Sequence, residues 1–383
     1  MMTTPSFPTT TYDLAIVGAG VVGLAHAYLA ASAGLRVVVI ERDGAANGAS
    51  VRNFGFITVT GQKRGEFYQL ARRSRAIWQT VIAELGLRAE HEGLYMCVRR
   101  PESEAILDAF LRTEMGEGCR LLAPSELPIP LSLDVRRVLH SPHEVRLESR
   151  DVIPQVAENL RRRLGVDFLY HCTALDVSHG QIATSLGTVR ARSVVVCQGD
   201  NLSGVFASRL PSFGVSRCKL QMLRLASPGY RLPGSIMSDL GLVRYLGYSE
   251  LDEAAALKIR LESEQPQHLK AGVHLIVVQG TDGSLVVGDS HSYDHTPDPF
   301  GLEAIDDLIL DEYRQVLGAP PPVLERWIGT YAVSDQQLYF IDTPDTDVRH
   351  VVVTCGAGAS TAFGIAEKTL SSLGVELHAT IVG

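Results

Sequence analysis

Within the first forty residues, short apolar runs typical of buried strands flank a longer apolar-rich stretch typical of a helix. A mostly apolar run over 13–17 predicts a buried strand, the apolar-rich stretch 21–33 predicts a helix, and a second apolar run over 36–40 predicts another buried strand. A strand, a helix and a strand in this order are typical of a parallel βαβ unit. The chain is therefore predicted to begin with an α/β lobe.

The remaining chain alternates helical periodicity with short apolar runs. Helical spacing predicts a long amphipathic helix over Glu66–Leu85, further helices over 151–163 and 302–316, and a closing helix that ends at about Leu373. Strands are predicted over 193–199, 217–224, 274–279, 285–288 and 350–354, with Thr281–Ser284 forming a hairpin turn. The proline-rich stretch 124–142 is expected to be loop and turn. The strands between 216 and 290 predict a second, mostly antiparallel lobe.

A glycine motif lies at the first predicted turn from strand to helix. Gly18, Gly20 and Gly23 form G-x-G-x-x-G, and Glu41 follows the second strand. The first glycine allows a tight turn, the second lets the backbone approach a pyrophosphate, and the third lets the helix pack closely on the strand. A carboxylate at the position of Glu41 is suited to accept hydrogen bonds from ribose hydroxyls. Because all these elements occur in register, they predict a dinucleotide site rather than an ordinary glycine-rich loop.

Composition narrows the classes of function. The formal charge of −8 argues against a nucleic-acid partner, and 45% hydrophobic content is typical of a globular protein. The six cysteines are far apart in sequence, which suggests neither a disulfide framework nor a zinc site, and the histidines show no metal-ligand spacing, so no metal is expected. No apolar run is long enough to span a membrane, and a cytoplasmic location is the expectation. The oligomeric state is left open.

A second glycine-rich loop, Cys355–Ser360, follows the predicted strand 350–354 and opens the last helix. The start of such a helix is suited to receive an anion or the polar edge of a ring. A tight turn without a ligand is the alternative interpretation.

Three features in this order resemble the superfamily of D-amino-acid oxidase, glycine oxidase and sarcosine oxidase. They are the N-terminal motif with Glu41, the strand that ends in Cys197-Gln198-Gly199-Asp200, and the C-terminal strand, glycine loop and helix. Within that superfamily, Gly48–Gly55, Cys218–Leu223 and Gly288–His291 resemble a bacterial subfamily associated with phosphonate breakdown. The resemblance covers essentially the whole chain.

The resemblance implies a two-lobe flavoprotein with noncovalent FAD. Its fold would combine a Rossmann-like, glutathione-reductase-like FAD lobe over 12–90, 145–213 and 327–383 with an α+β substrate lobe over 91–144 and 214–326. It implies that the flavin lies between the lobes and that the start of the last helix stabilises negative charge on the reduced ring. The residues expected to contact FAD are Gly18, Gly20, Val22, Gly23, Glu41, Arg42, Ser50, Asn53, Gly55, Ala174, Gly199, Gly356, Gly358, Ala359, Ser360 and Thr361.

The sequence departs from the amino-acid oxidases where they bind the substrate and the flavin. Tyr331 occupies the position of the arginine that clamps the substrate carboxylate, and Gly329 occupies the position of the flavin-linked cysteine of sarcosine oxidases. The lysine that assists oxygen in those enzymes is missing from the run Leu285–Gly288. These differences favour noncovalent FAD and a different substrate anion, and they leave dehydrogenase behaviour open.

The substrate expected from the resemblance is a small amine, and an aminophosphonate such as 2-aminoethylphosphonate or its N-methyl or hydroxylated forms is the leading candidate. A phosphonate has three oxygens and up to two charges, so several cations suit it better than one guanidinium. The residues expected to position this substrate are Arg52, Tyr331, His291, Lys219 and Arg244. For Lys219 and Arg244 a solvated surface cation is the alternative.

The predicted activity is oxidation of a C–N bond to an aldehyde and an amine, with O2 as the expected acceptor. A glycine-, sarcosine- or D-amino-acid-type oxidase and an FAD dehydrogenase with another acceptor are the nearest alternatives. An NAD-dependent dehydrogenase and a nonenzymatic flavoprotein are more distant ones.

Overall fold

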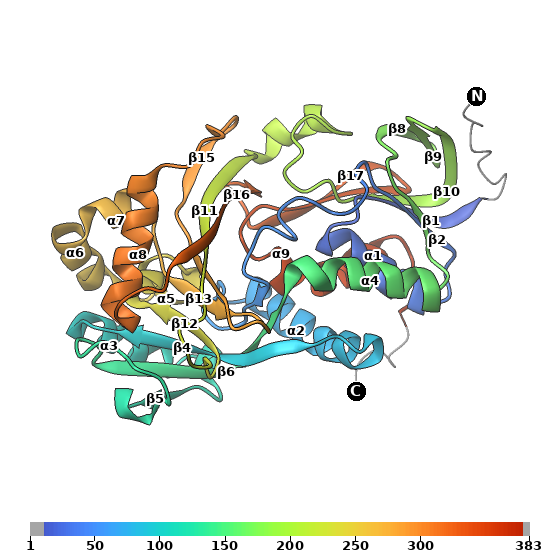
Figure 1. The fold of residues 1–383 in the computed structure, drawn as a ribbon. Helices are drawn as coiled ribbons and strands as arrows, with labels where there is room; N and C mark the ends of the chain where they lie inside the picture. The colour runs from blue at the N-terminus through green and yellow to red at the C-terminus, as the bar shows by residue number, and fades with distance from the viewer. Residues whose placement is uncertain (1–10, 378–383) are drawn as a thin grey trace.

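Two β-sheets, each with its own helices, organise the computed structural model of the chain, which describes residues 11–377 (Figure 1). The predicted mixed α/β class with a parallel nucleotide lobe and a mostly antiparallel second lobe is confirmed. In the described part of the chain, no helix combines the length and the apolar character needed to cross a membrane.

The first sheet contains the predicted βαβ unit. Its central strand β1 (Tyr12–Val17) pairs in parallel with β2 (Val37–Ile40) on one side and β10 (Gly187–Val196) on the other. The sheet continues outward through strands β7 (Asp167–Leu169), β18 (Val348–Val353) and β17 (Tyr339–Asp345), and β8 (Ala174–Ser178) and β9 (Gln181–Thr184) extend from β10 as a meander.

Both faces of this sheet are covered, which explains why its strands lack polar alternation. Leu14 and Ile16 of β1 pack against the helical layer, whereas Ala15 and Val17 pack against the meander side. Successive strand residues point to opposite faces, so a strand covered on both sides is apolar throughout. The helical layer consists of α1 (Val21–Ser32), α2 (Glu66–Leu85), α4 (Ser149–Arg163) and α9 (Gly358–Ser372) (Figure 1).

The second sheet is antiparallel except where β12 pairs in parallel with β4. In spatial order its strands are β15 (Ser292–Asp294), β11 (Ser216–Leu225), β14 (Leu285–Gly288), β13 (Ile276–Gln279), β12 (Ser235–Ser238), β4 (Ala89–Val98), β6 (Arg137–Leu147) and β3 (Phe56–Ile57), with β16 (Val323–Val333) beside β11 and β5 (Arg120–Leu122) beside β6. Its helices are α3 (Pro101–Phe110), α5 (Leu246–Ser249), α6 (Ala254–Glu264), α7 (Pro266–Lys270) and α8 (Glu303–Leu317). Short 3-10 turns are η1 (Glu114–Gly116), η2 (Pro124–Glu126), η3 (Ala207–Phe213) and η4 (Asp239–Val243).

The expectation of loop and turn over 124–142 is wrong in its last third, because β6 begins at Arg137. Pro142 obscured this strand in the sequence. The pairing of β6 with β4 is irregular between Ser141 and Val145, so Pro142 lies at a bulge where no regular ladder bond is required.

The lobe boundaries expected from the sequence stay a prediction, and two of them fall inside strands of the second sheet. The boundary at 327 falls inside β16, a strand of the second sheet, and the boundary at 145 falls inside β6. Residues 378–383 of the predicted FAD lobe lie outside the described residues.

A buried ionic network lies inside the second lobe. The Arg100 Nη1 atom donates to Asp239 at 2.9 Å, and the Arg99 guanidinium donates to Glu312 at 3.0 Å. Asp239 and Glu312 are both 0% exposed, so each charge depends on its partners for stabilisation.

Candidate active site

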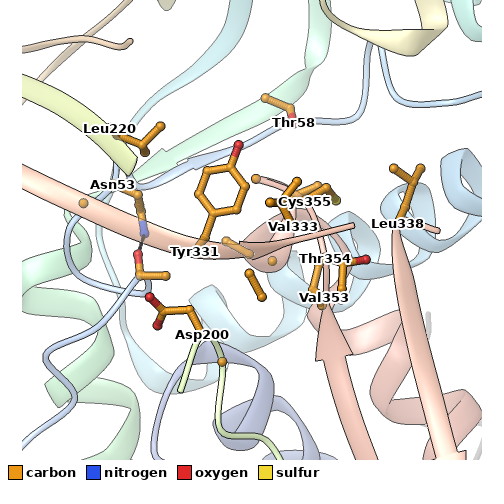
Figure 2. A pocket seen from close by; sticks show the side chains of 18 of the residues that line it. Asn53, Thr58, Asp200, Leu220, Tyr331, Val333, Leu338, Val353, Thr354 and Cys355 are labelled. Carbon is orange, nitrogen blue, oxygen red and sulfur yellow. Dashed lines mark hydrogen bonds between the residues drawn. The ribbon is translucent and has the colours of Figure 1, made fainter. Parts of the chain in front are cut away.

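A cavity of about 420 Å³ is lined by residues of both sheets. The first lobe contributes the start of α1, the loop over 49–54 and the loop that opens α9. The second lobe contributes β16 and residues near 244 and 289–293. Figure 2 shows Tyr331 from β16 extending between Leu220 and Cys355, with Asn53 and Asp200 near its base.

The glycine motif folds as its spacing predicts. A Cβ on Gly18 would lie 2.4 Å from the carbonyl oxygen of Cys197, and a Cβ on Gly23 would lie 2.0 Å from that of Gly18. Side chains are therefore excluded at both positions by backbone atoms, and Gly18 also has a φ of +105°. Gly20 and Val22 line the cavity at the start of α1.

Glu41 is buried below this loop. Its carboxylate accepts the backbone N–H of Ala19 at 2.8 Å and that of Asp43 at 3.0 Å. It therefore holds the glycine loop in place, a role that its position at the end of β2 did not reveal. Arg42 is exposed and pairs with Asp43, and Ala174 begins β8. Like Glu41, neither residue is among those that line the cavity, so their contact with FAD stays a prediction.

The loop over 49–54 is fixed against α1 by its polar side chains. The Ser50 hydroxyl accepts the N–H of Val21 at 2.9 Å, and the Asn53 amide donates to the Ala49 carbonyl at 2.5 Å. Ser50 and Asn53 both line the cavity, as does Gly199 at the end of β10. Gly55 does not line it; a Cβ there would lie 1.7 Å from the Leu147 carbonyl oxygen, which requires glycine for packing.

The loop that opens α9 also lies at the cavity. Gly356, Gly358 and Ala359 line it, whereas Ser360 and Thr361 are buried behind it. The Ser360 hydroxyl accepts the Thr58 N–H at 2.8 Å, which fixes the helix start. Two helices, α1 and α9, thus begin at one cavity, and the partial positive charge of their N-termini favours negative groups there.

The residues predicted to position a substrate separate into two groups. Arg52, Arg244, His291 and Tyr331 all line the cavity. Lys219 does not, because its ammonium donates to the carbonyls of residues 298 and 300 at 2.8 Å each. Its role is to hold that loop, so the expectation that it positions the substrate is withdrawn.

Arg244 is a half-buried cation at this cavity. Its guanidinium donates to the Tyr293 hydroxyl at 3.1 Å, and within residues 11–377 no carboxylate lies within 4.0 Å of it. Burial opposes its charge, but Tyr331, Tyr293 and Asp289 raise its pKa above the usual range. Arg244 therefore keeps its positive charge.

A cluster that the sequence did not predict lies beside Arg244. His274 Nδ1 is 3.2 Å from Asp289 Oδ1, and His291 Nε2 is 3.6 Å from Asp289 Oδ2. The expectation that the histidines do not cluster is wrong, because antiparallel pairing of the backbones of His274 and Asp289 brings distant residues together. Asp289 and His291 are two residues apart in the short segment between β14 and β15, and this closeness in sequence could have signalled the pair.

Fold and cavity together define a two-lobe α/β protein with a dinucleotide-type glycine loop at a cavity lined by both lobes. The family model for FAD dependent oxidoreductases, DAO, matches residues 13–371. The chain belongs to this family, and its cofactor is FAD.

Solved structures of the same fold cover nearly the whole chain. Glycine oxidase from Bacillus cereus ATCC 14579 is 17% identical, with 96% of this chain and 99% of that chain covered and a TM-score of 0.76. L-Proline dehydrogenase from P. horikoshii is 16% identical, with 97% and 95% covered and a TM-score of 0.77. Iminodiacetate oxidase from Chelativorans sp. BNC1 is 16% identical, with 94% of each chain covered and a TM-score of 0.69. The curated proteins contain no match to this chain.

The residues present fit FAD. Gly18 and Gly23 let the first loop pack tightly on the backbone around it, and Gly20 lines the cavity where a pyrophosphate would approach the backbone. The start of α9, which also lines the cavity, supplies partial positive charge.

Proposed function

We propose that this FAD-dependent oxidoreductase oxidises the C–N bond of a small amine that carries an anionic group, and that the substrate is an aminophosphonate. Oxidation of the C–N bond gives an imine, which water then hydrolyses to an aldehyde and an amine, or ammonia where the substrate is a primary amine. FAD supplies the acceptor for a hydride from the carbon next to the nitrogen. The protein binds the anion, orients the amine and excludes water.

The observation that carries this proposal is Arg244. Arg244 is a partly buried cation with no carboxylate within 4.0 Å of it among residues 11–377, so a cavity that holds it is suited to an anionic ligand. The Tyr293 hydroxyl lies 3.1 Å from the Arg244 guanidinium and Tyr331 lines the same cavity, so both hydroxyls would offer hydrogen bonds to the same anion.

The form of this site favours a phosphonate over a carboxylate. The position that carries a carboxylate-binding arginine in amino-acid oxidases is Tyr331 here, and Arg52 is a further cation at the cavity. Two separate guanidiniums with hydroxyl donors suit a group with three oxygens and up to two charges. An α-amino carboxylate would leave part of this donor set unused.

We further propose that FAD is bound noncovalently. A cysteine at position 329 is unfavourable, because a Cβ there would lie 2.9 Å from the Arg52 carbonyl oxygen. Cys355 lines the cavity, but burial raises the pKa of its thiol to about 12, so the nucleophilic thiolate is scarce at neutral pH. O2 is the proposed acceptor and the cytoplasm the proposed location.

The test is anaerobic reduction of the enzyme-bound flavin by a panel of amines, followed by absorbance. We expect 2-aminoethylphosphonate and its N-methyl form to reduce it with a larger second-order rate constant than glycine, sarcosine or D-alanine. If an amino carboxylate is at least as good, the aminophosphonate proposal is wrong and the amino-acid oxidase alternative replaces it. Anaerobic conditions also detect a dehydrogenase that does not react with O2.

A further inference from the structure

Asp289 and His291 face each other through atoms that both accept hydrogen bonds. His291 Nδ1 lies 2.8 Å from the Gly272 carbonyl oxygen, which can only accept, so Nδ1 carries the proton. Burial lowers the pKa of His291 well below its ordinary value, with Arg244 and His274 acting in the same direction, so the ring is neutral. Its Nε2 atom therefore carries a lone pair, and this atom lies 3.6 Å from Asp289 Oδ2.

Two acceptors held face to face in a buried site require a proton or a cation between them. Asp289 Oδ1 and both ring nitrogens of His274 also lack hydrogen-bond partners among the described residues. All three side chains are buried and line the same cavity as Arg244 and Tyr331. The cluster is thus open to a proton brought by a ligand in that cavity.

We propose that the cluster of Asp289, His274 and His291 accepts the proton that an ammonium substrate must lose before it is oxidised. This inference rests on the proposed amine oxidation. One N–H bond of the ammonium breaks, its electron pair stays on nitrogen, and the proton bonds to an Asp289 oxygen. The neutral amine can then give up a hydride from its neighbouring carbon to FAD. The proton leaves to solvent after the product.

The surroundings place this proton exchange near neutral pH. Burial raises the pKa of Asp289 to about 7, although Arg244 lowers it in part. The other titratable groups around it are His274 and His291, whose pKa values burial lowers, and Tyr245 and Cys218, whose pKa values burial raises. Burial favours the neutral form of each of these four groups, so the Asp289 carboxyl titrates against the fixed charge of Arg244.

The kinetic test compares wild type with Asp289→Asn in anaerobic flavin reduction from pH 6 to pH 10. In wild type the rate should rise with pH up to about 7 and then level, since the deprotonated carboxylate is the acceptor. In Asp289→Asn the rate at pH 7 should fall about 10²-fold and recover as pH approaches the amine's own pKa of roughly 10, where free amine is abundant. Equal pH profiles for the two proteins would overturn the inference.

A matched control is Asp306→Asn. Asp306 is another buried carboxylate of the second lobe, bound to Gln221 at 2.7 Å and Arg326 at 2.8 Å and absent from the residues that line the cavity. It should keep the wild-type pH profile. A profile shifted equally in both variants would assign the effect to lobe stability and contradict the inference.

Infrared difference spectra of the FAD-bound protein give a second readout that needs no substrate. A protonated-carboxyl band should disappear as pH rises through about 7, and Asp289→Asn should lack it. Absence of the band in wild type, or a stoichiometric transition metal lost in Asp289→Asn, would overturn the inference even if amines are oxidised. A flavin that no amine reduces would instead overturn the proposed function.

Discussion

Glu41→Ala should weaken FAD binding and also destabilise the apoprotein, and the two effects have separable origins. In the structure the carboxylate accepts the N–H groups of Ala19 and Asp43. Ala19 is 2% exposed, so its N–H would be left without a partner, at a cost of about 1–3 kcal/mol. Asp43 is exposed, so water can replace its lost bond.

The loss of FAD affinity comes from the proposed bond between Glu41 and the adenosine ribose. A hydrogen bond to a charged group is worth about 1.5–3 kcal/mol, which corresponds to roughly a ten- to a hundredfold larger Kd for FAD. Glu41→Gln is the matched variant: its carbonyl oxygen can still accept from Ala19, so it should spare much of the apoprotein stability while still lowering affinity.

The assays are urea unfolding of the apoproteins and FAD titration under conditions where each is folded. A lower unfolding midpoint for Glu41→Ala with an unchanged Kd for FAD would refute the ribose contact and leave Glu41 as a support of the glycine loop alone.

Three further predictions concern the buried ionic network, the link between protein and flavin, and the role of Arg52. Arg100→Ala should lower the free energy of unfolding by about 3–5 kcal/mol in urea, because Asp239 would remain as a buried charge with fewer partners; a change below about 1 kcal/mol would contradict a stabilising network. Acid precipitation of the purified yellow protein should leave the flavin in the supernatant, and flavin in the pellet would show a covalent link. Arg52→Ala should raise KM roughly ten- to a hundredfold with little change in kcat, because a group that binds the nonreacting end of the substrate acts equally in ground and transition states; a loss confined to kcat would exclude this role.

The parts of the fold that local patterns determine were predictable from the sequence. The long helix predicted over Glu66–Leu85 has those same bounds in the structure, because its apolar stripe faces the helical layer of the first lobe. The glycine spacing predicted the strand, turn and helix of the first nucleotide half. Gly18 is required by the Cys197 carbonyl just after the neighbouring strand β10, and Gly23 by the carbonyl of Gly18.

The substrate end of the site was less predictable from the sequence. Its residues depend on which face of a strand points into the cavity and on which distant segments pair with each other. Leu220 lines the cavity while its neighbour Lys219 binds a loop, and the sequence alone does not say which face of β11 is inward. The meeting of His274 with Asp289 depends on pairing between segments separated by a whole hairpin. Local periodicity carries no information on that contact.

The measurement that tests the central claim most directly compares three amines of similar length by anaerobic flavin reduction: 2-aminoethylphosphonate, β-alanine and propylamine. They carry a phosphonate, a carboxylate and no anion, so comparing them isolates the contribution of the anionic group that Arg244 would bind. The account predicts that the phosphonate reduces the flavin fastest and propylamine slowest, and that Arg244→Met removes most of the difference. Propylamine reacting as fast as the phosphonate in wild type would contradict it.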